Sequence, residues 1–129
     1  MSGAGSRTGK ELYEFGPFRV DPEKEILLRA GEHAPLTPKN FQILLTLVRH
    51  GKDVVTKDDL MEAVWPGTFV EETNLTRNVF ELRKALDESK ENRYILTVPG
   101  RGYRFAEDVR LVPEHEVSIV AANRARVRL

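Results

Sequence analysis

The sequence contains no cysteine, no net charge and no long hydrophobic run. Because none of the 129 residues is Cys, disulfides, thiolate metal ligands and Cys nucleophiles are excluded, and the composition fits a reducing compartment. The 20 Lys and Arg residues balance the 20 Asp and Glu residues, so a nucleic-acid or membrane partner has to be inferred from local charge. The longest apolar run lies within 117–122, far short of the ~18 residues that a membrane span needs.

The composition that remains predicts one folded domain. With 40% apolar and 31% charged residues, the chain has enough apolar sequence for one core and too much for a disordered protein. Residues 1–11 carry no apolar segment of the kind found in secretion signals, and we interpret them as a leader outside the fold. His33, His50 and His115 fall in separate elements without ligand spacing, so we expect no metal site.

Short apolar segments separated by turn residues occupy the region from Leu12 to Leu36. The breaks at 16–17, 21–22 and 31–32 contain Gly or Pro, which are typical of tight turns. We therefore predict a four-stranded antiparallel sheet that depends on later elements for stability, because strands this short are not stable alone. The predicted strands are 13–15, 18–20, 26–29 and 34–36.

Two helices with recognisable caps are predicted next. Thr37 can cap a helix with Pro38 in its first turn, and Gly51 ends it. After a short strand at 54–55, Thr56 can cap a second helix that ends before Pro66. The apolar positions are Phe41, Leu44, Leu45 and Val48 in the first helix and Leu60, Met61, Val64 and Trp65 in the second.

A third helix is predicted over 72–87, with one narrow apolar stripe formed by Leu75, Val79, Leu82 and Leu86. At ~1.5 Å per residue it is roughly 24 Å long, enough to lie in a DNA major groove. The outward face, opposite the stripe, carries Thr73, Arg77, Phe80, Glu81 and Lys84.

A β-hairpin with a basic turn follows the third helix. Residues 94–98 and 103–105 are the predicted strands, and 99–102 the turn between them. Beyond Leu111 the periodicity fades, so we expect a domain over 12–108 and a linker or tail over 109–129, in which 117–120 can add an edge strand. Between residues 90 and 104 the cations Lys90, Arg93, Arg101 and Arg104 outnumber the single acid Glu91.

A sheet, three helices and a hairpin in this order form a helix-turn-helix followed by a wing. From about Tyr13 to Ala106 the chain resembles the OmpR/PhoB-type winged-helix DNA-binding domain, and its wing sequence is most similar to the CadC/ToxR-like branch. The fold class implied is α+β, with an N-terminal four-stranded antiparallel sheet, three helices and a C-terminal β-hairpin wing. The motifs that carry the likeness are Thr37-Pro38, Trp65-Pro66, Val70-Glu71-Glu72, Asn74-Leu75-Thr76, Leu82-Arg83-Lys84-Ala85-Leu86 and the segment from Thr97 to Phe105.

The resemblance implies sequence-specific binding of double-stranded DNA by the output domain of a transcriptional regulator. The third helix would enter the major groove, and the wing would contact the minor groove or the backbone. The residues agree independently, because the Arg77 guanidinium suits guanine O6 and N7, and Arg101 at the turn suits a phosphate or the minor groove. The candidate DNA-binding residues are Asn74, Thr76, Arg77, Asn78, Glu81, Arg83, Lys84, Thr97, Arg101 and Tyr103.

Several of these residues have alternative interpretations. Tyr103 and Trp65 are expected to serve mainly in packing. Glu81 can accept a hydrogen bond from cytosine N4 or pair with Arg77 one turn earlier, and the pair is the preferred interpretation. Phe80 can contact a thymine methyl, a neighbouring subunit or the wing. Acids outnumber bases between residues 71 and 88, which predicts weak non-specific DNA affinity.

The alternative function is a winged helix for protein interaction or dimerisation with little DNA affinity, with RNA polymerase docking through 66–70 as one form. No nucleophile is paired with a base, so we expect no enzyme, no small-molecule substrate and no cofactor. The family's habit implies a head-to-tail homodimer on DNA. Because only a dozen residues precede the first strand, we expect no upstream receiver domain. We expect a cytoplasmic domain of a one-component regulator, with membrane contact only through a C-terminal region beyond the tail.

Overall fold

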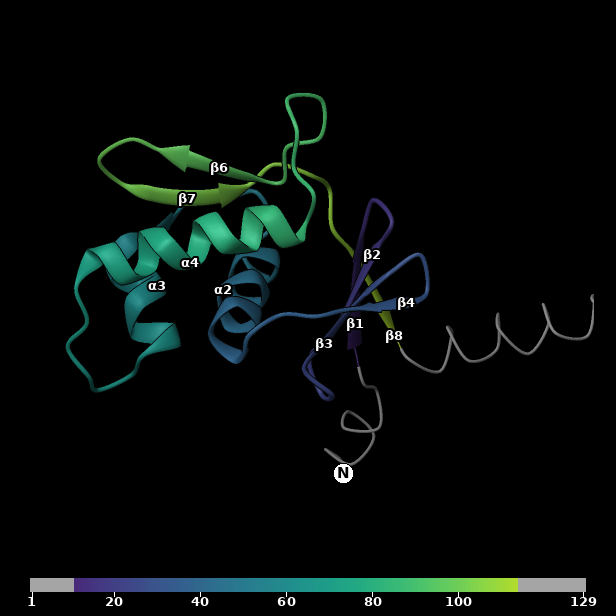
Figure 1. Ribbon diagram of the computed structural model, residues 1–129, viewed down its shortest axis with the longest axis horizontal. Coiled ribbons are helices and arrows are strands. Elements are labelled where there is room, and N and C mark those ends of the chain that lie inside the picture. Colours follow the sequence, from purple (N-terminus) through teal and green to yellow (C-terminus); the bar gives the residue numbers. More distant parts are fainter. Residues whose placement is uncertain (1–10, 114–129) are drawn as a thin grey trace, which may run out of the picture.

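The computed structural model describes residues 11–113, which form a helical layer flanked by two antiparallel sheets (Figure 1). The expected leader up to residue 10 and the tail beyond 113, with its edge strand at 117–120, lie outside the described residues. The helices are α2 (Pro38–Arg49), α3 (Lys57–Val64) and α4 (Glu72–Ala85). The strands are β1 (Glu11–Phe15), β2 (Phe18–Asp21), β3 (Ile26–Arg29), β4 (Glu32–Ala34), β5 (Val55–Thr56), β6 (Ile95–Val98), β7 (Gly102–Phe105) and β8 (Arg110–Pro113). The predicted α+β winged-helix class is confirmed.

The N-terminal sheet has five strands, in the order β4-β3-β2-β1-β8, where the sequence predicts four. β8 comes from residues expected to be a linker, and Glu11, expected in the leader, begins β1. The sheet therefore includes residues on both sides of the expected domain, 12–108. β8 pairs with β1, burying Val112 opposite Leu12, and the Glu14 carboxylate binds Arg110 at 2.6 Å and Arg19 at 2.7 Å. β8 pairs with β1, which is remote in sequence, so local periodicity gives little indication that residues 110–113 form a strand.

The predicted strand at 34–36 is displaced, because the structure places β4 at Glu32–Ala34. Ala30 and Gly31, with φ of 50° and 86°, form the turn between β3 and β4. Two consecutive residues with positive φ form the tight turn that matches the twist of a hairpin, and such a turn fixes the register of its strands. Arg29 therefore pairs with Glu32, and Leu27 with Ala34.

The predicted helix caps are confirmed. The Thr37 hydroxyl accepts from the Asn40 N–H, and the Thr56 hydroxyl accepts from the Asp59 N–H. α2 ends at its C-cap His50 and is followed by Gly51 with a φ of 60°. α4 ends at Ala85, two residues before the predicted end, because Asp87 takes a φ of 58° that a helix does not accept.

The core joins the helices to both sheets. The predicted stripe of α4 is buried throughout, with Leu75 and Leu82 fully inaccessible. At the base of the wing, the rings of Phe15 and Phe105 lie 4.7 Å apart and those of Phe15 and Tyr94 lie 5.4 Å apart, in edge contacts. These rings link β1 to both ends of the hairpin β6-β7, so the N-terminal sheet supports the wing.

One glycine decides how closely the wing approaches the helices. β7 pairs with β5 through Val55 and Thr56, and a Cβ atom at Gly102 would lie 2.0 Å from the Val55 carbonyl oxygen. Any side chain at this position would force the two strands apart. Gly102 therefore fixes the hairpin next to the first turn of α3.

Candidate nucleic-acid interface

The outward face of α4 is exposed, and its polar side chains make few contacts. Arg77 donates to the Asn74 side-chain oxygen at 3.4 Å, and Thr76 donates to the Glu72 carbonyl at 3.3 Å. Asn78 is half-buried and donates to the Asn74 carbonyl at 2.8 Å. The structure thus places four of the predicted residues on consecutive turns of one helix, with the Arg77 guanidinium largely free.

Glu81 does not pair with Arg77, so the preferred interpretation of this residue is wrong. Its carboxylate instead accepts from the side-chain amide of Asn40, in the first turn of α2, at 3.4 Å. Arg77 and Glu81 have the spacing of a helical ion pair, but each side chain has another partner: the Asn40 amide for Glu81 and the Asn74 side-chain oxygen for Arg77. Asn40 lies 41 residues before Glu81, so no local pattern of residues points to this contact.

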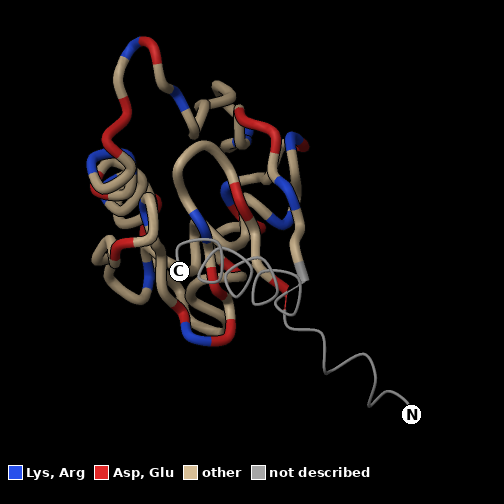
Figure 2. Tube along the Cα trace, turned by 90° about the vertical axis from the view of Figure 1, so that its right-hand side faces the viewer, with Lys and Arg blue, Asp and Glu red and all other residues tan. Residues whose placement is uncertain are grey.

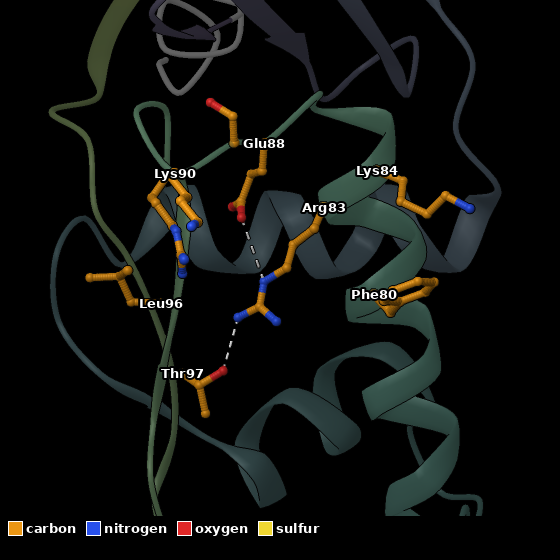
Figure 3. Close-up of a pocket in the computed structure, with 9 residues that line it drawn as sticks. Phe80, Arg83, Lys84, Glu88, Lys90, Leu96 and Thr97 are labelled. Atoms are coloured by element: carbon orange, nitrogen blue, oxygen red, sulfur yellow. Dashed lines mark hydrogen bonds and ion pairs between the residues drawn. The ribbon is translucent and has the colours of Figure 1, made fainter.

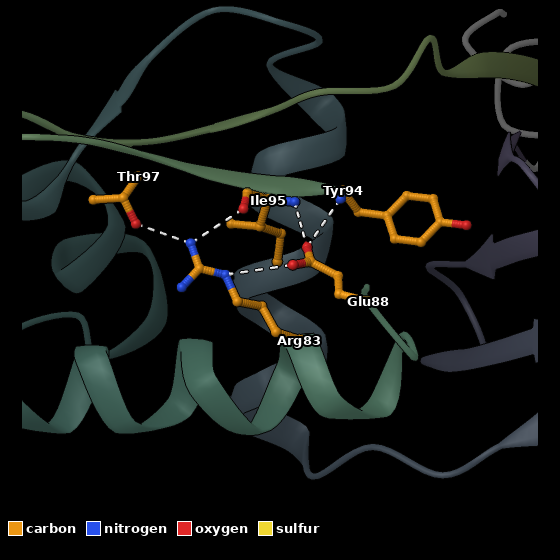
Figure 4. Close-up of polar contacts among 5 residues, drawn as sticks. All are labelled: Arg83, Glu88, Tyr94, Ile95 and Thr97. Atoms are coloured by element: carbon orange, nitrogen blue, oxygen red, sulfur yellow. Dashed lines mark hydrogen bonds and ion pairs between the residues drawn. The ribbon is translucent and has the colours of Figure 1, made fainter. Parts of the chain in front are cut away.

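Arg83 lies on the flank of α4 that faces the wing, where its guanidinium contacts three groups (Figure 4). It donates to the Ile95 carbonyl at 3.1 Å and to the Thr97 hydroxyl at 2.9 Å, and it approaches the Glu88 carboxylate at 3.8 Å. Glu88 in turn accepts from the N–H groups of Tyr94 and Ile95 at 2.9 and 2.7 Å. The two side chains together satisfy the outer edge of β6 as a neighbouring strand would.

The structure therefore brings Arg83 and Thr97 into direct contact. The DNA contacts expected of both residues stay predictions. Tyr103 is 6% exposed and lies under the Arg83 guanidinium, 6.0 Å from ring centroid to Cζ. This burial agrees with the packing interpretation of Tyr103. Trp65 is half-buried against the core, with the Lys39 ammonium 5.8 Å from its ring centroid.

A cleft of about 550 Å³ opens between the second half of α4 and β6 (Figure 3). The Arg83–Glu88 pair lies in this cleft, and the exposed ring of Phe80 forms part of one wall with the Lys84 ammonium 5.3 Å from its centroid. Lys90 and Arg93 enter from the loop between α4 and β6, and neither makes a hydrogen bond or ion pair to another described residue. Both belong to the basic cluster seen in the sequence, although neither was a candidate site residue.

The turn of the wing carries Arg101 into solvent. Its backbone is fixed from both sides, because Arg101 N–H donates to the Val98 carbonyl at 2.9 Å and its own carbonyl accepts from Lys57 N–H at 3.1 Å. A hydrogen bond from the Lys57 ammonium to the Glu72 carboxylate, at 2.6 Å, raises the pKa of Lys57 and joins the starts of α3 and α4. The wing turn, α3 and α4 thus form one continuous support.

Lys and Arg residues are interspersed with Asp and Glu residues along the described part of the chain (Figure 2). Within residues 11–113 there is no group of three His, Asp or Glu side chains placed to hold a metal ion. Over the same range, no helix is both long enough and apolar enough to cross a membrane.

An exposed helix face beside a rigid hairpin, supported by a second sheet, defines a winged-helix domain. The chain belongs to the family described as "Transcriptional regulatory protein, C terminal", whose model matches residues 31–105. The resemblance to OmpR/PhoB-type domains is thereby confirmed. This family consists of DNA-binding domains of transcriptional regulators, and the relatives of this chain include proteins described as a transcriptional regulator and a DNA-binding response regulator.

Two relatives illustrate the breadth of the likeness. The chain is 40% identical over 86 residues to the transcriptional regulator HilA of Salmonella typhimurium, which covers 67% of this chain and 16% of HilA. It is 32% identical over 107 residues to the transcriptional activator CadC of Escherichia coli, which covers 81% of this chain and 21% of CadC. The chain thus spans about a fifth or less of the length of these relatives.

Solved structures show the same fold. The DNA-binding domain of Escherichia coli CadC superposes with a TM-score of 0.70 at 29% identity, covering 81% of this chain and 99% of that domain. The DNA-binding domain of Klebsiella pneumoniae RstA, solved in complex with the RstA box, superposes with a TM-score of 0.65 at 26% identity, covering 74% of this chain and 96% of that one.

Proposed function

We propose that this domain binds double-stranded DNA in a sequence-specific manner, with α4 in the major groove and the β6-β7 wing on the minor groove or backbone. The observation that carries the proposal is the exposed, largely unengaged Arg77 in the middle of the outward face of α4. A guanidinium free to adopt its own geometry can donate two parallel hydrogen bonds to guanine O6 and N7. The RstA domain, which shares the fold, was solved bound to its DNA site.

The wing supplies the second contact. Arg101 projects from a turn whose backbone is held by α3, so it can meet a phosphate or the minor groove with little loss of freedom. Lys84, Lys90 and Arg93 surround the cleft between α4 and β6, on the side of α4 that adjoins the outward face. Cations without acidic partners are the groups that phosphates attract, and they favour this side as the path of one DNA strand.

The decisive experiment is selection of bound sites from a randomised duplex pool, followed by dimethyl sulfate footprinting on the enriched site. The reagent methylates guanine N7 in the major groove and adenine N3 in the minor groove, so it reports on both predicted contacts separately. We expect an enriched motif, protection of guanine N7 beneath α4, and protection of adenine N3 in the flank beneath the wing. With Arg101→Ala, the minor-groove protection should disappear while the guanine protection remains.

The salt dependence of binding gives an independent measurement. If five or so phosphates are contacted, log K should fall with log[salt] at a slope of about −4 to −5. An absence of any enriched motif at low salt would contradict the proposal. Enrichment with protection confined to the minor groove would contradict the placement of α4.

A second candidate function rests on the loop between α3 and α4. Phe69 in this loop is 88% exposed, more than any other large hydrophobic side chain among the described residues. An exposed aromatic ring is typical of a protein-contact surface, and RNA polymerase is the partner that such a regulator would meet. Phe69→Ala should leave DNA affinity unchanged and reduce transcription activation from the selected site.

The larger assembly is also part of the proposal. Direct repeats in the selected site would indicate a head-to-tail homodimer on DNA, and a single motif would indicate a monomer. The relatives HilA and CadC are several times longer than this chain, and we propose that sensing, and any attachment to a membrane, belong to regions beyond the winged helix.

A further inference from the structure

The outward face of α4 carries one acidic side chain that the proposed function leaves unexplained. Glu81 is exposed, and it lies one turn after Arg77 on a surface that is expected to meet phosphates. No cation pairs with it among residues 11–113, so its full negative charge faces outward. Its one hydrogen-bonding partner is the neutral amide of Asn40.

Asn40 is unusual within the core. Tyrosines aside, it is the one buried residue with a polar side chain in the described part of the chain, at 4% exposed. Its Nδ2 donates to Glu81 Oε1 at 3.4 Å, but its own Oδ1 is buried and has no partner. A buried acceptor without a partner costs free energy on folding. The cap of α2 does not need this amide, since Thr37 binds the Asn40 backbone N–H.

The contact from Asn40 has a specific effect on Glu81. A neutral donor orients the carboxylate without cancelling its charge, whereas a pair with Arg77 would have neutralised both groups. Arg77 instead contacts Asn74, on the other side. The face therefore holds a donor and an acceptor that do not neutralise each other, about 6 Å apart along the helix axis, which corresponds to roughly two base-pair steps.

We propose that Glu81 reads the N4 amino group of a cytosine in the major groove, and that Asn40 is a positioning residue that holds the carboxylate for this contact. The inference rests on the proposed function. A carboxylate only accepts hydrogen bonds, so it favours a base that presents an amino group and is repelled by guanine O6 and thymine O4. Glu81 would thus add selectivity more than affinity, in keeping with the excess of acids over bases between residues 71 and 88.

The test compares the base preferences of three variants with wild type on the selected site, using duplexes that differ at one position. We expect wild type to prefer cytosine at one position by roughly tenfold. Glu81→Gln should move that preference to adenine, because a glutamine amide can bind adenine N6 and N7 together. Asn40→Leu should reduce the cytosine preference to below about threefold, with the other positions of the motif unchanged.

Stability separates positioning from packing. Leu has the same number and branching of side-chain heavy atoms as Asn, and Asn40→Leu removes the unpaired acceptor, so the variant should melt at the wild-type temperature or above while its selectivity falls. If Asn40→Leu does not fold, Asn40→Ser tests the same loss of the amide in a smaller side chain. Glu71→Gln is the matched control: Glu71 precedes α4, its side chain makes no cap bond, and its loss should leave the base preference unaltered.

A cytosine preference in the Asn40 variants equal to that of wild type would overturn the role of Asn40. An unchanged preference in Glu81→Gln would overturn the readout itself. These failures differ from failure of the proposed function, in which wild type would select no motif at all.

Discussion

The two flanks of α4 use arginine in opposite ways. On the flank that faces the wing, Arg83 binds a backbone carbonyl, a hydroxyl and a carboxylate, and it lies over the Tyr103 ring. On the outward face, Arg77 makes one contact of 3.4 Å with Asn74. Arg77 and Arg83 are six positions apart on one helix, yet the Arg83 guanidinium stabilises the fold and the Arg77 guanidinium is left free to bind. The difference teaches that residue type and helix position do not reveal function until the partners are known.

Arg77→Ala is expected to produce the largest effect. Loss of a two-bond contact to guanine should weaken binding to the selected site by about 10- to 100-fold, corresponding to about 1–3 kcal/mol. The free energy of unfolding should change little, because the one hydrogen bond of Arg77, to Asn74, is long, exposed and within the same helix. Fluorescence anisotropy titrations and urea denaturation of the same preparations would measure both. A DNA affinity equal to that of wild type would contradict the role of Arg77 as a DNA contact.

Arg83→Ala should give the reverse pattern. Its hydrogen bonds to Ile95 and Thr97 hold the edge of β6, and bonds from a charged donor contribute about 2 kcal/mol, so urea denaturation should show a loss of stability of about that size. DNA affinity, corrected for the folded fraction, should fall only through loosening of the wing. A stable Arg83→Ala domain with strongly weakened binding would instead restore Arg83 as a direct phosphate contact.

The double variant Lys90→Ala, Arg93→Ala extends the comparison to two cations that neither stabilise the fold, as Arg83 does, nor lie on the outward face of α4, as Arg77 does. If both contact phosphates in the cleft, the slope of log K against log[salt] should become less steep by about 2 units, with affinity reduced equally for all sequences. Lys24→Ala, in the turn between β2 and β3, is the matched control for loss of an exposed cation. A slope identical to that of wild type would place the cleft outside the DNA path.

Glu14→Gln tests the ion pairs of Glu14 with Arg19 and Arg110, which serve only the stability of the N-terminal sheet. This variant should have the smallest effect. Burial alone would raise the Glu14 pKa, but the hydrogen bonds from Arg19 and Arg110 outweigh burial and hold it below its usual value. A carboxylate with a lowered pKa stabilises the fold at neutral pH, and this stabilisation is lost as the pH falls through the folded-state pKa. The variant should be less stable than wild type by about 1 kcal/mol or less at pH 7.

Thermal melts across pH would reveal this behaviour, since the difference between wild type and Glu14→Gln should shrink as both are taken below about pH 4. Glu11→Gln, in the same strand but without the arginine partners, should follow wild type throughout. A constant difference at every pH would show that the glutamine disturbs packing rather than the ion pairs.

Features that depend on neighbouring residues could be predicted from the sequence. The Thr37 and Thr56 caps, the stripe on α4 and the hairpin strands each follow from residue types within one or two turns, and each was confirmed. β8 was not predicted because its four residues are too few to show an alternating pattern, and its partner Glu14 lies 96 residues from Arg110.

In the candidate site, too, local features were predicted and contacts with remote residues were not. The spacing along α4 placed Arg77 and Phe80 on an exposed face, as the structure has them. The same spacing suggested an Arg77–Glu81 pair, which Asn40 replaces, because a competing donor on another helix has no signature in the local sequence. Periodicity thus predicts which way a side chain points but not which remote group it meets.

The pairing of β1 with β8 has a mechanical consequence. Glu11 lies opposite Pro113 in the sheet, so the chain enters and leaves the described fold at the same end of one strand pair, at the opposite side of the domain from the turn of the wing (Figure 1). A force applied between these two points would peel β8 from β1 one hydrogen bond at a time and reach the Glu14–Arg110 ion pair last. α4 and the wing lie outside this path and would keep their shape until the strand pair had opened.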